Sequence, residues 1–165
     1  MNARSIVWGL ALVALAVIVQ TTLFSRLDDL GVVADIVMVV VLVSARWLDP
    51  EPALLLGFTG GVLYDLNGTT PIGLRAMVFT ILAYGAVRLA TSSEGSHLSA
   101  AIAVVVLSFA GVVLFTMVGT LFGQGSLRGI SVVQTFVLFP LFNGVLSIAV
   151  GPLIKRVMVK EKVLL

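Results

Sequence analysis

Long apolar runs separated by short polar stretches make up most of the chain. The runs cover residues 6–24, 30–48, 53–67, 71–90, 99–122 and 132–154. Most have about the 20 residues that a helix needs to cross the roughly 30 Å hydrocarbon core of a bilayer. The stretches between them hold turn-forming residues, such as DPEP at 49–52 and NGTT at 67–70. The pattern predicts an all-α integral membrane protein, with residues 1–165 forming one compact bundle of six transmembrane helices.

Three of the runs carry additional expectations. A cleaved signal peptide is the alternative for the first run, but that run ends in QTTLFSRLDDL and lacks a small-residue cleavage site, so we interpret it as an anchor. The third run is short and rich in glycine. If it were re-entrant, five spans would place the two termini on opposite sides of the membrane. In the last run, Pro140 is expected to kink the helix.

The composition agrees with a membrane protein and excludes several other classes. Hydrophobic residues are 59% of the chain, charged residues only 11%, and the mean hydropathy is +1.18. A net charge of +2, with no basic cluster before the last dozen residues, does not suit nucleic-acid binding. The absence of cysteine excludes disulfides and thiolate ligands, and a single histidine, His97, is too little for a zinc site. We therefore expect no metal and no cofactor.

The positive charges indicate an orientation for the six-span arrangement. One side would carry seven of the ten basic residues: Arg4, Arg46, Arg88, Lys155, Arg156, Lys160 and Lys162. The other would carry Arg26, Arg75 and Arg128. By the positive-inside rule the first side is cytoplasmic, and it holds both termini. The basic tail KRVMVKEK would also suit anionic lipid or a cytoplasmic partner, although topology already accounts for it.

Two charges, Asp65 and Arg75, lie within the apolar pattern near the NGTT turn. Gly57, Gly61 and Asp65 are spaced four apart and so form one stripe on a helix, where glycines allow a neighbouring backbone to approach. Because the helices on either side of NGTT run antiparallel, Asp65 and Arg75 are expected at similar depths, close enough to pair. The pair either clamps this hairpin or lines a functional site. Pairing also predicts that the exchange of Asp65→Arg with Arg75→Asp restores folding.

Other polar residues in the runs have simpler interpretations. Asp35 is expected to stabilise the start of the second helix, and the alternative is that it faces Arg75 in competition with Asp65. Three amide side chains are expected to form hydrogen bonds between helices: Gln20, Gln134 and Asn143.

An enzyme is disfavoured by the same polar inventory. Ser126 lies in a glycine-rich loop, GQGSLRG, but the six-span arrangement places it on the opposite side from His97, the only available imidazole base. Asp28 and Asp29 are the only adjacent carboxylates, and a solvated turn explains them better than a metal site does. We therefore expect no catalytic residues.

The stretch GFTGGVLYDLNGTTPIGLRAM, at residues 57–77, resembles the family of the rod shape-determining protein MreD. The residues that carry the resemblance are Gly57, Gly61, Asp65, Gly68, Pro71, Gly73 and Leu74. Span layout and length agree over nearly the whole chain. The sequence departs from the family pattern at Ala34, where proline is frequent, and at Gly61-Val62-Leu63, where Gly-Leu-Leu is frequent.

The resemblance implies a non-enzymatic subunit of the bacterial cell-elongation machinery in the cytoplasmic membrane. Its implied partners are MreC first, then MreB filaments, RodA and a transpeptidase, with a lipid as a possible ligand. The candidate partner- or ligand-binding residues are Asp35, Gly57, Gly61, Asp65, Gly68, Pro71, Gly73 and Arg75.

The family is also similar in fold to the substrate-binding S components of ECF vitamin transporters, which supply the alternative function. An S component docks its coupling subunit through alanines spaced four apart on the first helix. Here Ala11, Ala14 and Ala16 do not have that spacing, which disfavours the transporter interpretation.

Overall fold

The computed structural model describes residues 3–24, 34–67, 71–92, 97–123 and 132–160, and the regular structure within these ranges is helical. The elements are α1 (Ala3–Val19), the π-helical η1 (Gln20–Phe24), α3 (Ile36–Ala45), α4 (Pro50–Asp65), α5 (Leu74–Ser92), α6 (His97–Leu121), the π-helical η2 (Gln134–Leu138) and α7 (Phe139–Lys160). Three stretches are long and apolar enough to cross a membrane: Ser5–Thr22, Leu98–Leu121 and Gln134–Met158. The chain is therefore an all-α membrane protein.

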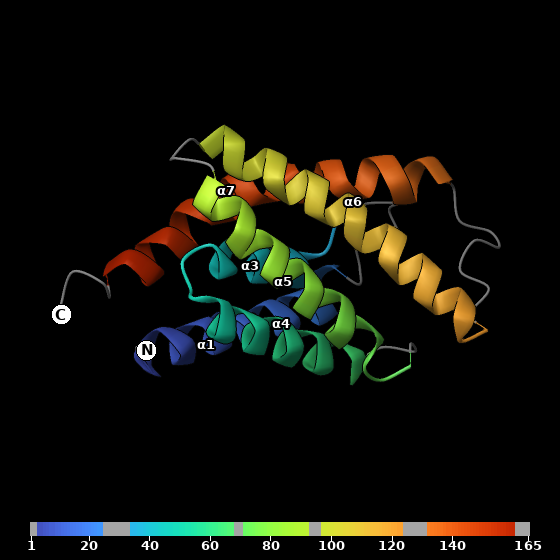
Figure 1. Cartoon of the computed structure of the whole chain (residues 1–165), viewed down its shortest axis with the longest axis horizontal. Coiled ribbons are helices and arrows are strands. Elements are labelled where there is room, and N and C mark those ends of the chain that lie inside the picture. Colours follow the sequence, from blue (N-terminus) through green and yellow to red (C-terminus); the bar gives the residue numbers. More distant parts are fainter. Residues whose placement is uncertain (1–2, 25–33, 68–70, 93–96, 124–131, 161–165) are drawn as a thin grey trace.

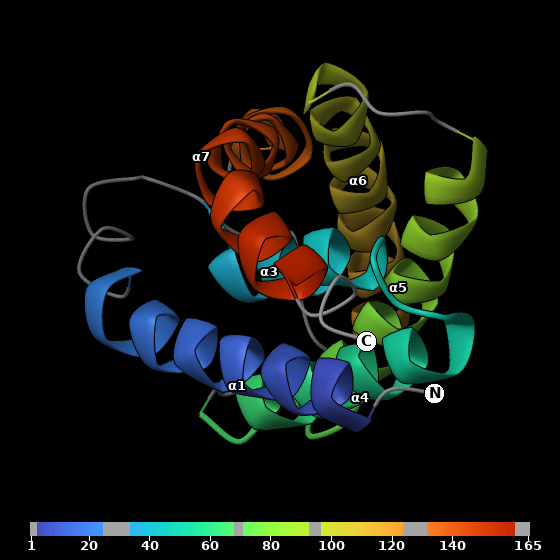
Figure 2. The ribbon, with the colours of Figure 1, turned by 90° about the vertical axis from the view of Figure 1, so that its left-hand side faces the viewer.

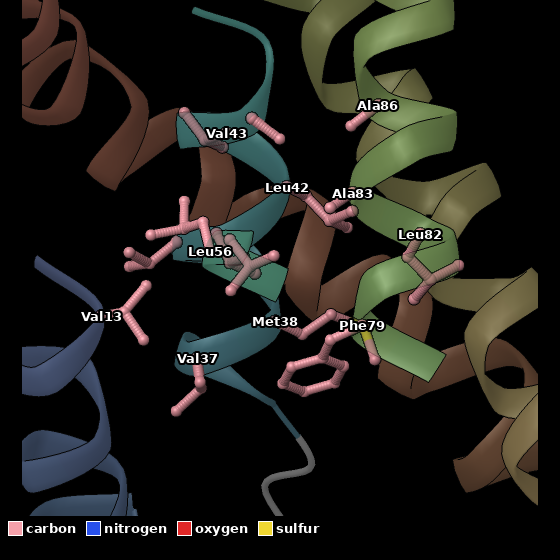
Figure 3. Close-up of a cluster of buried hydrophobic side chains, with 14 of the residues drawn as sticks. Val13, Val37, Met38, Leu42, Val43, Leu56, Phe79, Leu82, Ala83 and Ala86 are labelled. Carbon is pink, nitrogen blue, oxygen red and sulfur yellow. The ribbon is translucent and has the colours of Figure 1, made fainter. Parts of the chain in front are cut away.

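The short helix α3 lies at the centre of the bundle. It contacts α1, α4, α5, α6 and α7, which surround it in Figure 2. Every residue from Val37 to Ala45 is buried, which is expected of a helix that is apolar on all sides. Figure 3 shows side chains of α3, such as Met38 and Leu42, among core residues of the neighbouring helices, such as Leu56 and Phe79. The core is thus built around the shortest α-helix among the described residues.

The outer surface of the bundle is apolar. Large hydrophobic side chains are exposed along α6, for example at Ile102 and Phe109, and along α7, for example at Val145 and Ile148. In water such faces would need a protein cover, whereas in a bilayer lipid solvates them. The start of α1 and the end of α7 lie at the same end of the molecule (Figure 1), which we call the terminal end. The opposite end, where α4 ends and α5 begins, we call the hairpin end.

Some helix starts differ in detail from the apolar runs. The second run begins at Leu30, whereas α3 begins at Ile36, because the Asp35 carboxylate accepts a hydrogen bond (2.8 Å) from Met38 N and caps the helix there. Residues 30–33 lie outside the described ranges. The fourth run begins at Pro71, but Gly73 has a φ of 102°, outside the helical region, and α5 begins after it. The helix α4 begins at Pro50, three residues before the third run, because the prolines of DPEP fit its first turn.

The last helix is irregular just before Pro140, where a kink was expected. Proline has no N–H, and its ring collides with the carbonyl four residues earlier in a regular α-helix. The chain adopts the π-helical η2 over Gln134–Leu138, and Phe139 N donates to Gln134 O, five residues back. Pro152, which lies inside α7, was not singled out from the sequence.

Candidate functional site

The α4–α5 hairpin is packed backbone against backbone through two glycines. A Cβ added to Gly57 would lie 2.6 Å from the carbonyl oxygen of Phe79, and one added to Gly61 would lie 2.6 Å from the carbonyl carbon of Arg75. Neither position has room for a side chain, because the neighbouring atoms belong to the α5 backbone. The close approach expected from the Gly57–Gly61–Asp65 stripe is therefore present, and α5 is the neighbour.

Asp65 is the last residue of α4, and its side chain is enclosed by the beginning of α5. The residue is only 1% exposed. Its Oδ2 accepts hydrogen bonds from Gly73 N (2.8 Å) and Arg75 N (3.1 Å). Amides at the start of a helix have no intrahelical acceptor, and a negative charge is favourable at that position. Asp65 thus supplies from α4 the N-terminal cap that α5 lacks in its own sequence.

The predicted partnership of Asp65 with Arg75 is also observed, as a loose ion pair. Arg75 Nη1 lies 3.7 Å from Asp65 Oδ1, which is longer than a hydrogen bond. The guanidinium stacks over the ring of Tyr64, 4.3 Å from its centroid, and lies 5.4 Å from the ring centroid of Phe115 on α6. The side chain remains 22% exposed. Arg75 therefore connects the hairpin to α6 and still reaches the surface of the hairpin end.

The capping role of Asp65 was missed in the sequence, although a signal for it is present. An acidic residue ends one helix, and a Pro-x-Gly turn precedes the next by a few residues. Recognising the cap requires the backbone conformation of the turn, in which Gly73 has a positive φ and the amides of Gly73 and Arg75 reach Asp65. Charge spacing alone indicates the ion pair and gives no information on those amides.

The remaining candidate residues of the turn are closer to the surface. Pro71 is exposed and Gly73 is half-buried, and Ile72 between them is 70% exposed. Leu66, directly after α4, is exposed too. Gly68 lies outside the described residues. The hairpin end consequently consists of a buried polar clamp beneath an exposed apolar rim, formed by Leu66, Pro71 and Ile72.

A second polar cluster lies at the start of α3 and joins it to η1, α6 and α7. Asp35 N donates to Asn143 Oδ1 (2.9 Å), and Asn143 Nδ2 donates to Ser108 Oγ on α6 (3.2 Å). Gln20 accepts from Ile36 N (2.9 Å) and donates to Ala34 O (3.3 Å). The interpretation of Asp35 as a helix-start residue is confirmed, and Gln20 and Asn143 join helical segments as predicted.

The same prediction is wrong for Gln134. Its side chain is exposed on η2 and makes no hydrogen bond within the described part of the chain. Gln134 is the first residue of η2, and although η2 contacts α6 and α7, this side chain lies on its exposed side.

The chemistry of both clusters is structural. In each, carboxylate and amide groups satisfy backbone N–H or C=O groups at helix starts. Within the described residues no three His, Asp or Glu side chains gather as a metal site would require. The loop residues weighed in the sequence, Asp28, Asp29 and Ser126, lie outside the described residues.

Comparison with known proteins adds one finding. A family model described as rod shape-determining protein MreD matches residues 3–160. The match includes every described helix, from α1 to α7. The curated proteins and the solved structures give no match.

Proposed function

This chain belongs to the MreD family of rod shape-determining proteins, and we propose that it is a non-enzymatic subunit of the cell-elongation complex that binds MreC. In this proposal it helps to couple MreB filaments to RodA and the transpeptidase that synthesise lateral wall. The family match over residues 3–160 is the observation that carries the proposal. The role in rod shape and the inner-membrane location follow from the family and the apolar helices.

The membrane arrangement in this proposal has six spans in one domain, with both termini in the cytoplasm. The unequal distribution of lysine and arginine supports this orientation. It is also supported by the terminal end, where α1 starts and α7 finishes side by side. The hairpin end then faces the periplasm, where it is accessible to the periplasmic region and transmembrane helix of MreC.

We assign the MreC-binding surface to the rim of the hairpin end. Asp65, Gly57 and Gly61 are buried, so they act by holding the 71–73 turn in one conformation. The exposed rim residues and the partly exposed Arg75 are the groups that a partner would contact. Arginine is enriched among the residues that dominate protein interfaces, and the apolar rim beside it would lose contact with water on binding. Asp35 supports the same end indirectly by fixing the start of α3.

A pull-down with two matched variants tests the assignment. Ile72→Lys changes the rim, whereas Leu121→Lys changes an equally apolar side chain, 84% exposed, at the end of α6. In mild detergent, with mass spectrometry of the recovered proteins, Ile72→Lys is expected to recover about tenfold less MreC than wild type because a charge at an interface hot spot is costly. Leu121→Lys is expected to recover wild-type amounts.

Equal recovery of MreC by both variants, at equal membrane levels, would contradict the assigned surface. Absence of MreC and wall synthases from the wild-type sample would contradict the proposed function itself. Recovery of an ATPase and a coupling subunit in their place would support the S-component alternative.

A further inference from the structure

Arg46, the residue that follows α3, has a guanidinium nitrogen that is buried without a hydrogen-bond partner among the described residues. Its Nη1 is buried, and the side chain makes no hydrogen bond or ion pair within the part of the chain that the structure describes. The nearest acidic residues along the sequence, Asp49 and Glu51, are both exposed at the start of α4. The position of Arg46 at a helix C-terminus is electrostatically favourable, but it satisfies none of the guanidinium donors.

A buried and unpaired guanidinium nitrogen needs an explanation. Arginine stays protonated in proteins, so Arg46 cannot avoid the cost by losing its charge. The other buried polar atom without a partner among the described residues, Ser44 Oγ, is neutral and costs less to leave unpaired. A group that pairs with Nη1 would accept hydrogen bonds, and a negatively charged one, such as a phosphate or a carboxylate, would form the strongest bonds.

A second cation lies against the residue that follows Arg46 in the chain. Lys155 on α7 places its Nζ 5.7 Å from the ring centroid of Trp47, the residue after Arg46. Figure 2 views the bundle from the terminal end, and α7 is one of the helices that contact α3. Arg156 follows on the exposed surface of α7. The end of α3 and the last part of α7 therefore both carry positive charge at the terminal end.

The surroundings match a membrane interface. Trp47 is half-buried, and tryptophan is enriched at the level of lipid headgroups. On α7, Ile148 lies seven residues before Lys155 and hence on the same helix face, where it is 52% exposed. A headgroup between Arg46 and Lys155 would thus have an apolar surface beside it for its acyl chain.

We propose that Arg46, with Lys155, binds the phosphate of an anionic phospholipid in the leaflet at the terminal end. The arginine fork is suited to two parallel hydrogen bonds with one phosphate, and anionic lipids are abundant in the cytoplasmic leaflet. A carboxylate from a protein partner is disfavoured because the flanking groups are those of a lipid interface. This site lies at the opposite end of the bundle from the MreC-binding surface; it rests on the proposed orientation, with the terminal end in the cytoplasmic leaflet, but not on MreC binding.

Native mass spectrometry of the full chain tests the lipid site. The protein is reconstituted in nanodiscs of phosphatidylcholine containing phosphatidylglycerol, released into mild detergent, and examined for retained lipids. Wild type is expected to retain at least one phosphatidylglycerol per chain. Arg46→Gln is expected to bind it about tenfold more weakly, because hydrogen bonds to a charged group are lost. Arg46→Lys keeps the positive charge but loses the paired N–H donors of the guanidinium, so it is expected to retain an intermediate amount of phosphatidylglycerol.

Arg88→Gln is the matched control. It removes the same charge at an exposed guanidinium that already bonds the Tyr84 hydroxyl through Nε (2.9 Å), so its lipid retention should equal that of wild type. Equal lipid loss in Arg46→Gln and Arg88→Gln, or no retained phosphatidylglycerol in wild type, would overturn the proposal. The proposal would also be overturned if protein in pure phosphatidylcholine retained inorganic phosphate at the Arg46 site, because the ligand would then be a soluble anion.

Discussion

A single carboxylate, that of Asp65, is bonded both to the backbone and to a side chain. Oδ2 accepts from the amides of Gly73 and Arg75, while Oδ1 faces the Arg75 guanidinium at 3.7 Å. The hydrogen bonds from the two amides are shorter than the contact with the guanidinium, and the carboxylate that accepts them is fully enclosed. Most of the stabilisation should therefore come from capping α5, and the ion pair should contribute less.

The two functions of Asp65 can be separated by substitution. Asp65→Asn retains an oxygen that can accept from Gly73 and Arg75, so we expect a loss of about 1 kcal/mol in the free energy of unfolding. Asp65→Ala leaves both amides without that acceptor, and we expect a loss of about 3 kcal/mol. Thermal unfolding in detergent, followed by tryptophan fluorescence, measures both. Equal losses for the two variants would show that charge dominates.

The exchange of Asp65→Arg with Arg75→Asp, which the charge spacing predicts to restore folding, is now expected to fail. An arginine at position 65 has no acceptor to offer the two amides that Asp65 caps. The double variant should be no more stable than Asp65→Ala. The sequence was sufficient to predict the pair because both charges lie near one turn. It was insufficient to predict the caps because these depend on the backbone conformation of Gly73.

At the scale of elements, the α4–α5 hairpin depends on two positions where a side chain has no space. Gly61 is the tighter, since its closest neighbours are backbone atoms of Arg75 and Ala76. A methyl group there must push α5 away from α4. It would also lengthen the hydrogen bonds from the α5 amides to Asp65, which lies one helical turn after Gly61.

Gly61→Ala is therefore expected to lower the free energy of unfolding by about 1–3 kcal/mol, as overpacking does in well-packed cores. Gly151→Ala on α7 is the matched control, because a Cβ there would have no neighbour within 4 Å. Alanine is the better helix former, so the control should equal wild type or exceed it slightly in the same unfolding assay. A Gly61→Ala protein as stable as the control would refute the tight packing.

The apolar runs predicted the helices well and their detailed form less well. All six runs contain helix, because apolar length is visible in the sequence. The central position of α3 was not predicted, since in a membrane protein buried and lipid-facing residues are equally apolar and the pattern does not distinguish them. The π-helical turns were also missed, apart from the irregularity expected at Pro140, because they depend on local packing as well as on sequence.

At the scale of the whole molecule, the two ends of α4 allow a direct test of topology. The chain contains no cysteine, so a single introduced cysteine is the only thiol. Glu51 at the start of α4 and Asn67 just beyond its end are both exposed. In intact spheroplasts, a membrane-impermeant maleimide should label Asn67→Cys and should label Glu51→Cys only after permeabilisation.

Labelling of both positions from one side would mean that α4 does not cross the membrane, as in the five-span alternative. Labelling of Glu51→Cys alone would invert the orientation and move the hairpin end to the cytoplasm. Either result would also require a different contact with MreC from the one we propose.

The π-helical turns have a consequence for how this chain can vary in length. Each closes its hydrogen bonds one residue further back than an α-helix does, and so holds one surplus residue. Deleting a residue from Gln134–Leu138 would turn that segment into ordinary α-helix and leave α7 in register. The same deletion in the middle of α5 would rotate half of the helix by about 100°, moving Phe79 or Leu82 out of the core. Insertions and deletions tolerated in evolution should accordingly concentrate at η1 and η2.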